Sequence, residues 1–345
     1  MMFRLNLTLL AVAWALLQLH LVAVTIPQAH AWPTPPSWVP HFKSQRPADY
    51  YSRRNLKTIS TIYSLTVYPR QLPIFQAGGA GVPKGLFNQD VVGRVDPVGN
   101  FTGFEHSIEY FFALSPLPQG NPVNAAITGY QITEFSSQCR DVAASVVYLY
   151  CSVVNPGAPD HGTPLPPLKQ VAFWRFDEQG AVLKYDAWIP NLHSWVESTT
   201  AAYVADPAFR AGSIQQICAG TQARCTGANT QWASVDECVT ALSQKAYGSY
   251  DEAWGDNVVC RSIHLVLTQV RPDVCVSLSH SLLCNGTTQT SRTANQETLQ
   301  THCPHVGPTG GGKCVNVDYP DNYFADETLY GQPKGQTFMC GASDD

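Results

Sequence analysis

Three side chains in the first half of the sequence are of the types that acid–base chemistry needs: His106, Tyr185 and Asp186. A histidine and a carboxylate that face each other across a pocket could move a proton between carbon and oxygen, as general base and general acid. The competing interpretation is structural. A histidine on the flank of a helix is often exposed or hydrogen-bonded, and Asp186 could share the solvent face of a strand with Lys184. The sequence leaves both interpretations open.

Three histidines in the second half could bind a metal ion: His264, His302 and His305. The pair His302-x-x-His305 beside a helical His264 could supply three imidazoles to zinc or copper. The cysteines nearby are expected to be oxidised, so they would not serve as ligands, and the spacing matches no established metal motif. The alternative is a set of structural histidines held in place by disulfides. Apart from this metal ion, we expect no cofactor.

Tyr185 and Asp186 fall in a predicted antiparallel hairpin over residues 168–195. Alternating apolar and polar residues flank a turn at 177–180, which is the pattern of a hairpin. The other elements predicted in the first half are a helix over 53–68, a loop over 78–85, a helix over 103–114 opened by a capping box of Thr102 and Glu105, strands over 126–135 and 143–154, and a helix from 189 to about 202.

The helix predicted over 103–114 carries His106. Its apolar stripe consists of Phe104, Ile108, Phe111 and Phe112, which places His106, Glu109 and Tyr110 on other faces. Helices followed by a long curved run of strands favour an α+β domain, with one sheet wrapped around helices.

Two stretches, 99–111 and 171–186, together resemble the SnoaL-like branch of the NTF2-like superfamily. That branch has G-x-F-x-G-x-E before the sheet and F-R-F-D-x-x-G-K-I at the hairpin, where Ala181 replaces the usual lysine. The resemblance covers about residues 55–200 and implies a cone, in which a curved antiparallel sheet encloses a cavity closed by helices. The fold hosts cyclases, isomerases, dehydratases and non-catalytic binders, so it implies no reaction. Such domains often pair through the convex sheet face, and a homodimer is therefore an expectation.

The second half is predicted as a small, disulfide-rich and mainly helical domain. N-caps at Asp206 and Ser234 and an apolar stripe over 257–270 indicate three helices. The pattern from Cys260 to Cys314 resembles a module of extracellular fungal and bacterial proteins. The expected organisation is a signal peptide over 1–31, a proline-rich arm over 32–52, the SnoaL-like domain over 53–203 and the cysteine-rich domain over 206–345.

The first residues predict export from the cell. Arg4 precedes a long apolar run from Leu5 to Ile26, and Ala29-His30-Ala31 follows, a pattern typical of a signal peptide cut after Ala31. The run is also long enough for a membrane anchor, but Asn6, Gln18 and His20 interrupt it, which favours cleavage. Cleavage would leave a secreted chain with no membrane segment. Asn100 is predicted as a glycosylation site, and Asn285 lies in a second sequon. The net charge of −5 and the lack of a basic stripe argue against nucleic acid as a partner.

Eleven cysteines in a secreted chain predict disulfides. Pairing cannot be deduced from sequence, but proximity along the chain suggests Cys303–Cys314, Cys238–Cys260 and Cys139–Cys151. The odd count leaves one thiol over. The candidates for disulfides are Cys139, Cys151, Cys218, Cys225, Cys238, Cys260, Cys303, Cys314 and Cys340.

Residues 274–300 do not fit the helical pattern around them. They are rich in serine and threonine, show no periodicity and contain two cysteines. Their codons could contain the donor, branch point and acceptor of a short intron in frame. We interpret the stretch either as a retained intron or as a disordered, glycosylated insertion.

Two functions from different classes follow. One is a secreted, cofactor-free lyase, isomerase or cyclase that acts on a small apolar molecule. The other is a non-catalytic extracellular module that binds a ligand or a protein and is stabilised by disulfides. An enzyme needs an enclosed pocket with at least two ionisable groups near a common point, whereas a binder would have an apolar pocket or an exposed patch without them.

Overall fold

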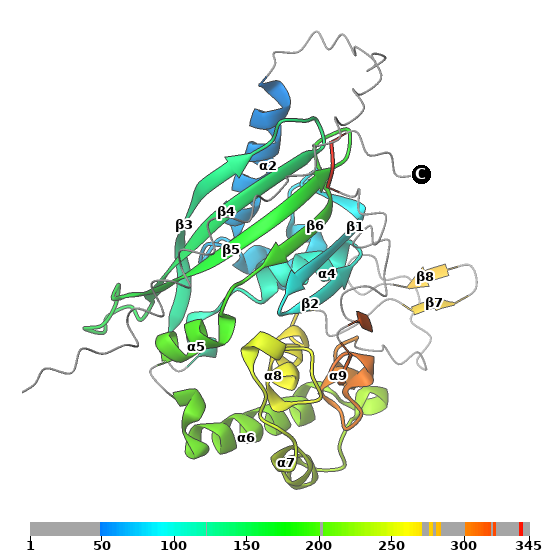
Figure 1. Ribbon diagram of the computed structural model, residues 1–345. Helices are drawn as coiled ribbons and strands as arrows, with labels where there is room; N and C mark the ends of the chain where they lie inside the picture. The colour runs from blue at the N-terminus through cyan, green and yellow to red at the C-terminus, as the bar shows by residue number, and fades with distance from the viewer. Residues whose placement is uncertain are drawn as a thin grey trace, which may run out of the picture. The chain divides into compact units, whose positions relative to one another are not determined.

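The computed structural model describes residues 49–121, 123–200, 203–270, 276–278, 281–283, 301–318, 320–321 and 338–340 (Figure 1). The predicted signal peptide, most of the proline-rich arm and the sequon at Asn285 lie outside these residues, as does most of the 274–300 stretch. None of the described helices is long and apolar enough to cross a bilayer.

A six-stranded curved sheet, in the order β2-β1-β6-β5-β4-β3, forms the first half of the described chain (Figure 1). The predicted α+β class is confirmed. The sheet is not wholly antiparallel, however, because β1 and β6 run parallel. The strands are β1 (Phe87–Asp96), β2 (Gly99–Thr102), β3 (Ala125–Ser136), β4 (Val142–Val153), β5 (Pro164–Phe176) and β6 (Val182–Trp188). β5 and β6 form the predicted hairpin, whereas β1 and β2 were not predicted.

Helices pack on one face of this sheet and form the core with it. Helix α2 (Tyr50–Thr66) contacts β3 and β4 and buries Ile59, Ile62 and Tyr63, as its helical spacing predicted. The short helix α3 (Leu72–Ala77) follows. Next come α4 (Phe104–Ile108) and a single π-helical turn, η2 (Glu109–Ala113), in place of the continuous helix predicted.

Two details of the α4–η2 segment differ from prediction. Glu105 does not close a capping box: the N-cap is Gly103, and the Glu105 carboxylate accepts a hydrogen bond from the backbone N–H of Gly79. Glu109 and Tyr110 are buried rather than turned away from the core, at 1% and 8% exposure. The wider π turn explains the second difference, since it changes which residues face inward.

A separate helical core is formed by α6 (Pro207–Arg224), α7 (Val235–Ser243) and α8 (Val258–Leu267). Helix α5 (Leu192–Thr200) and the turn η6 (Tyr250–Glu252) pack against the core of the sheet, and α9 (Cys303–Val306) forms a small cluster with Cys225. The side chains of Asp206, Ser234 and Asn257 each accept a hydrogen bond from a backbone N–H in the first turn. The predicted caps at Asp206 and Ser234 are therefore confirmed.

The described residues contain four disulfides, of which three lie within the second half and one joins the two halves, and none joins a predicted pair. They are Cys139–Cys340, Cys218–Cys238, Cys225–Cys303 and Cys260–Cys314. The predicted pairs were wrong because cysteines were matched by closeness in sequence, whereas the fold joins residues up to 201 positions apart. Cys151, also a disulfide candidate, is a buried free thiol on β4.

Candidate functional site

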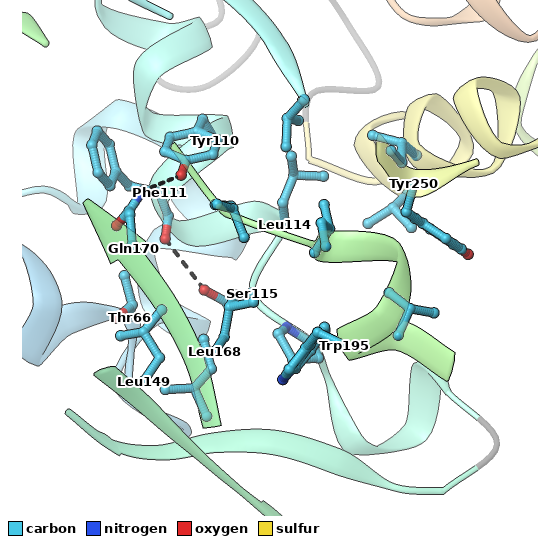
Figure 2. Close-up of a pocket in the computed structure, with 18 of the residues that line it drawn as sticks. Thr66, Tyr110, Phe111, Leu114, Ser115, Leu149, Leu168, Gln170, Trp195 and Tyr250 are labelled. Carbon is cyan, nitrogen blue, oxygen red and sulfur yellow. Dashed lines mark hydrogen bonds between the residues drawn. The ribbon is translucent and has the colours of Figure 1, made fainter. Parts of the chain in front are cut away.

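A cavity of about 290 Å³ lies where the sheet meets α2, η2, α5 and α8 (Figure 2). Aliphatic and aromatic side chains from all of these elements form most of its wall. Among the described residues that line it, none is Asp, Glu, His, Lys or Arg. The lining residues are Tyr63, Thr66, Val98, Tyr110, Phe111, Leu114, Ser115, Pro116, Ile127, Leu149, Leu168, Gln170, Ile189, Leu192, Trp195, Val196, Tyr250, Ser262, Ile263 and Val266.

Three polar side chains in the wall of the cavity are joined by hydrogen bonds. The Tyr63 hydroxyl donates to Gln170 Oε1 at 2.6 Å. Figure 2 shows the second bond, in which Gln170 Nε2 donates to the Tyr110 hydroxyl oxygen. These bonds use both ends of the Gln170 amide and the acceptor side of Tyr110. The Tyr110 hydroxyl therefore keeps its own hydrogen for a further acceptor.

The tyrosines of the cavity stay protonated at neutral pH. Burial raises the pKa of Tyr63 well above its ordinary value, and burial likewise raises the pKa of Tyr110. At the other end of the cavity, burial raises the pKa of Tyr250 to about 12. A phenol in this state can donate a hydrogen bond but cannot serve as a base.

The structure does not bring His106, Tyr185 and Asp186 together. Tyr185 and Asp186 are neighbours on β6, so their side chains point to opposite faces of the sheet. Tyr185 is buried in the core, where its hydroxyl lies 3.2 Å from Ser107 Oγ. His106 is half-buried, and its Nδ1 donates to the carbonyl of Thr102. None of the three lines the cavity.

On the other face of the sheet, Asp186 forms a bidentate ion pair with Arg94 of β1, with bonds of 2.9 and 2.8 Å. Burial raises the pKa of Asp186, and the hydrogen bonds from Arg94 oppose this shift. On the inner face, Tyr185 packs over Gly93, where a Cβ atom would lie 2.0 Å from the phenol ring. Both contacts cross the parallel β1–β6 pair, so these residues join two strands that are distant in sequence.

The three histidines, in contrast, do converge. His264 Nδ1 lies 3.3 Å from His302 Nδ1 and 3.2 Å from His305 Nδ1. His302 Nε2 donates to the buried carboxylate of Glu109 at 3.1 Å. Burial, together with the neighbouring imidazoles, lowers the pKa of His264 well below its usual value. The same causes lower the pKa of His305 to about 3.

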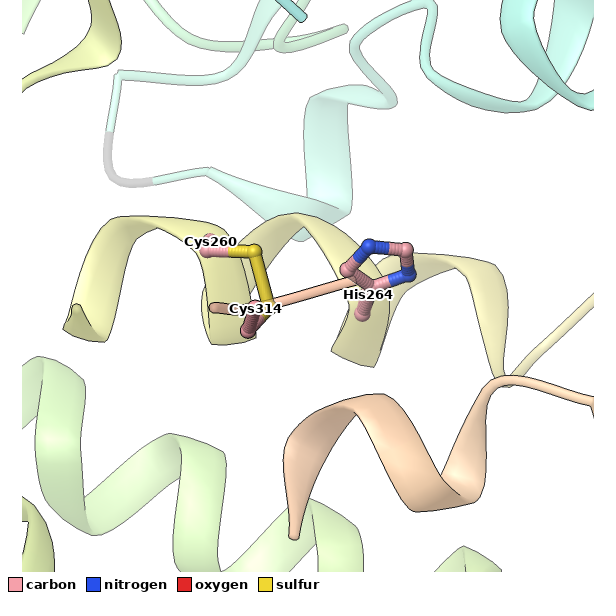
Figure 3. A group of neighbouring side chains, drawn as sticks. All are labelled: Cys260, His264 and Cys314. Atoms are coloured by element: carbon pink, nitrogen blue, oxygen red, sulfur yellow. A yellow bond between two sulfur atoms is a disulfide. The ribbon is translucent and has the colours of Figure 1, made fainter. Parts of the chain in front are cut away.

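The disulfide Cys260–Cys314 lies beside His264 on α8 (Figure 3). Its sulfur atoms are within 4.8 Å of a nitrogen of that ring, but sulfur in a disulfide is not a thiolate and is a poor metal ligand. The imidazoles, and not the disulfide, are therefore the groups of this cluster that could hold a metal ion, and the predicted metal site stays a prediction.

Three polar residues of these two sites were missed by the sequence analysis or assigned to another face: Gln170, Tyr110 and Glu109. Gln170 occupies an inward position of β5 that alternation alone would give to an apolar residue, which is a detectable signal. Tyr110 and Glu109 belong to the π turn, for which the sequence carries no comparable signal.

Two family models match this chain, side by side. The model of the BfoA N-terminal domain matches residues 66–187, and that of the BfoA family C-terminal domain matches residues 180–281. Together they span more than half of the sequence. Residues 66–281 are therefore similar to the two BfoA domains in their order. The proposed likeness of the second half to an extracellular module is not tested by these matches and stays a prediction.

Relatives from two fungi extend over most of the chain. The aurasperone B biosynthesis cluster protein A of Aspergillus niger is 27% identical over 305 residues, which are 85% of this chain and 87% of the relative. The bifonsecin B biosynthesis cluster protein A of Aspergillus brasiliensis is 27% identical over 283 residues, 79% of this chain and 82% of the relative.

SnoaL-like proteins are among the structural neighbours, as the sequence resemblance predicted. A protein described as a SnoaL-like polyketide cyclase, from a Jannaschia species, has a TM-score of 0.30 at 12% identity and covers 46% of this chain and 98% of its own. A Mycobacterium tuberculosis protein in complex with estradiol-17beta-hemisuccinate has a TM-score of 0.26 at 15% identity, with 40% and 95% covered.

Proposed function

We propose that this protein binds a small, largely apolar molecule in the cavity and that Tyr110 donates a hydrogen bond to an oxygen of that molecule. One observation carries the proposal: an apolar wall is interrupted by the ordered chain from Tyr63 through Gln170 to Tyr110. With the Gln170 oxygen toward Tyr63 and its nitrogen toward Tyr110, the hydrogen of the Tyr110 hydroxyl is the donor available to a ligand. Sites for small molecules commonly combine such a wall with a few placed polar groups.

The lining supports binding better than acid–base catalysis. Removing a proton from carbon requires a group that accepts it near neutral pH, usually a carboxylate or an imidazole. The described lining residues include neither, and burial keeps the three tyrosines protonated. The cofactor-free lyase, isomerase or cyclase is therefore the second candidate. Tyr110 could serve it as a proton donor, but the described lining residues include no carboxylate or imidazole to serve as the base.

The names of the relatives suggest the origin of the ligand. Because both relatives are named after biosynthesis clusters, we expect an intermediate or product of a secondary-metabolite pathway to be the ligand. The apparent signal peptide and four disulfides favour binding outside the cell. The homodimer and the glycan at Asn100 stay predictions.

The test uses two probes with the same ring skeleton, fluorenone and fluorene, of which fluorenone alone carries a carbonyl. Trp195 lines the cavity, so quenching of its fluorescence reports binding. Val196→Trp places a large side chain at the cavity wall and is expected to abolish binding of both probes. Glu197→Trp, on the more exposed face of the same helix, is the matched control and should leave binding unchanged.

Tyr110→Phe separates the hydrogen bond from the apolar wall. Fluorenone should bind about fivefold more weakly to this variant, since a neutral hydrogen bond contributes about 1 kcal/mol. Fluorene should bind as it does to the unmodified protein. If neither probe binds, or if Val196→Trp leaves their affinity intact, the cavity is not a ligand site. An equal loss for both probes would remove Tyr110 from its proposed role.

A further inference from the structure

The distances among the three histidines fit a metal centre of one geometry. Zinc–nitrogen bonds of about 2.0–2.1 Å place two ligands of a tetrahedral site about 3.3–3.4 Å apart, and two ligands at right angles about 2.8–3.0 Å apart. His264 Nδ1 lies 3.3 Å from Nδ1 of His302 and 3.2 Å from Nδ1 of His305. The nitrogens of His302 and His305 lie within 4.8 Å of each other. The spacing therefore favours tetrahedral coordination.

A single linear hydrogen bond between neutral rings accounts for only one of the two short contacts. Each Nδ1 carries either one hydrogen or one lone pair. The Glu109 carboxylate accepts from Nε2 of His302, so Nδ1 of His302 presents a lone pair. If His264 Nδ1 donates a hydrogen bond to His302 Nδ1, it has no lone pair with which to accept one from His305. If His264 Nδ1 instead accepts from His305 Nδ1, the lone pairs of His264 Nδ1 and His302 Nδ1 face each other at 3.3 Å. A cation at the centre would instead accept all three lone pairs.

Glu109 supplies the outer contact that metal-binding histidines usually have. A carboxylate that accepts from the far nitrogen of a ligand ring fixes its tautomer and orientation and increases its basicity. The Glu109 side chain is 2% exposed and that of His302 is 4% exposed, so water does not compete for this bond. The carboxylate also offsets part of the positive charge that Lys313 and Arg261 bring near the cluster.

Covalent and polar links hold the ligand-bearing segments in place before any ion binds. Cys303, between His302 and the rest of α9, is joined to Cys225 of the α6 C-terminus. The fully buried guanidinium of Arg261 on α8 donates to the carbonyl of Gly307, just after α9. The disulfide fixes α9 to α6, and the Arg261 bond fixes α8 to the turn that follows α9. A rigid scaffold of this kind reduces the entropy lost when a metal ion is bound.

We propose that His264, His302 and His305 bind one Zn²⁺ through their Nδ1 atoms, with Glu109 as the positioning residue behind His302. The three neutral nitrogen ligands suit zinc, and the tetrahedral spacing disfavours the right-angled arrangements common for Cu²⁺ and Ni²⁺. Three protein ligands leave the fourth position for water or another small ligand. The site is separate from the cavity, whose lining includes none of these residues.

The test is a metal titration of the full chain after removal of bound metal with a chelator. We expect one zinc per chain by elemental analysis and by calorimetry. Co²⁺ in place of zinc should give the intense visible absorption of a tetrahedral complex. His264→Gln and His305→Gln should lose binding, and Glu109→Gln should weaken it about 10–100-fold. His161→Ala, which removes an exposed histidine of a surface turn, is the control and should bind zinc normally.

Circular dichroism checks that each variant is folded. If His264→Gln does not fold, the Co²⁺ spectrum of the unmodified chain and the zinc titration of Glu109→Gln still test whether the histidines bind zinc. Less than one zinc per reloaded chain, or a weak octahedral Co²⁺ spectrum, overturns the proposal. So does a folded His264→Gln or His305→Gln that binds zinc as tightly as the His161→Ala control, because the metal would then lie elsewhere.

Discussion

Replacing Gln170 with methionine tests whether the polar chain of the cavity is a single cooperative unit. Gln170 is 3% exposed, and methionine has a similar length and no hydrogen-bonding amide. The substitution removes the acceptor of the Tyr63 hydroxyl and the donor to Tyr110. Because Tyr63 is 1% exposed, water cannot easily replace the lost partner.

The magnitude follows from the burial of the two hydroxyls. An unsatisfied buried hydroxyl costs about 1–3 kcal/mol, which applies to Tyr63. Tyr110 faces the cavity, where water could partly replace the amide, so a lost neutral hydrogen bond of about 0.5–1.5 kcal/mol is the better estimate. We expect Gln170→Met to lower the free energy of unfolding by about 2–4 kcal/mol, a large part of the total for a typical domain.

The measurement is equilibrium unfolding in urea with the disulfides intact, followed by tryptophan fluorescence. An unchanged dependence on urea would show that the variant differs in stability and not in compactness. Tyr63→Phe and the double variant Tyr63→Phe/Gln170→Met complete a double-mutant cycle. The double variant should be less destabilised than the sum of the single variants, since neither partner is left alone. Strictly additive losses, or a loss below about 0.5 kcal/mol for Gln170→Met, would refute the reasoning.

Four further outcomes can be checked. Gln71 is fully buried and its amide has no hydrogen-bond partner among the described residues, so Gln71→Met should raise the free energy of unfolding by about 1–2 kcal/mol in the urea assay. Arg94→Met should lower it by about 3 kcal/mol, because Asp186 is left as a nearly buried charge, while probe binding in the cavity stays unchanged. Burial raises the pKa of Cys151 to about 12, so alkylation at pH 8 followed by peptide mass analysis should find this thiol unmodified in the native protein and modified after unfolding. Sequencing of the cDNA should show a transcript without codons 274–300; a transcript that keeps them removes the intron interpretation.

Elements with local sequence signals were predicted well. The hairpin over 168–195 has alternation on both sides of a turn, and the N-caps at Asp206 and Ser234 are confirmed by side-chain hydrogen bonds. Strand β1 gave no such signal, because Gly93 and the polar residues around it are poor strand formers. It forms because Gly93 accommodates the ring of Tyr185 across the parallel pair, a contact that only the folded sheet supplies.

The candidate sites also differ in whether the sequence carries a signal for them or only the folded chain brings their residues together. The histidines at 264, 302 and 305 could be grouped from residue type alone, and the structure brings them together through disulfides whose pairing the sequence does not reveal. Tyr185 and Asp186 could not share a pocket, because adjacent residues of a strand face opposite sides. The polar residue that does reach the cavity from the hairpin, Gln170, looks like an ordinary strand residue until its neighbours are known.

The π turn η2 contributes to two sites. Successive residues of any helical turn point in different directions, about 100° apart in an α-helix, so neighbours can contact different surroundings. Glu109 faces His302, whereas Tyr110 faces Gln170 and the cavity. Helix α8 repeats this division, with Ile263 lining the cavity and His264 in the histidine cluster. Zinc bound at the cluster would link α8 to α9 directly and to η2 through the bond from His302 to Glu109, and both α8 and η2 form part of the cavity wall. We therefore expect removal of zinc to weaken the binding of fluorenone and fluorene alike, because the wall shifts while the Tyr110 donor remains. A selective loss for fluorenone would instead place the effect on the hydrogen bond of Tyr110.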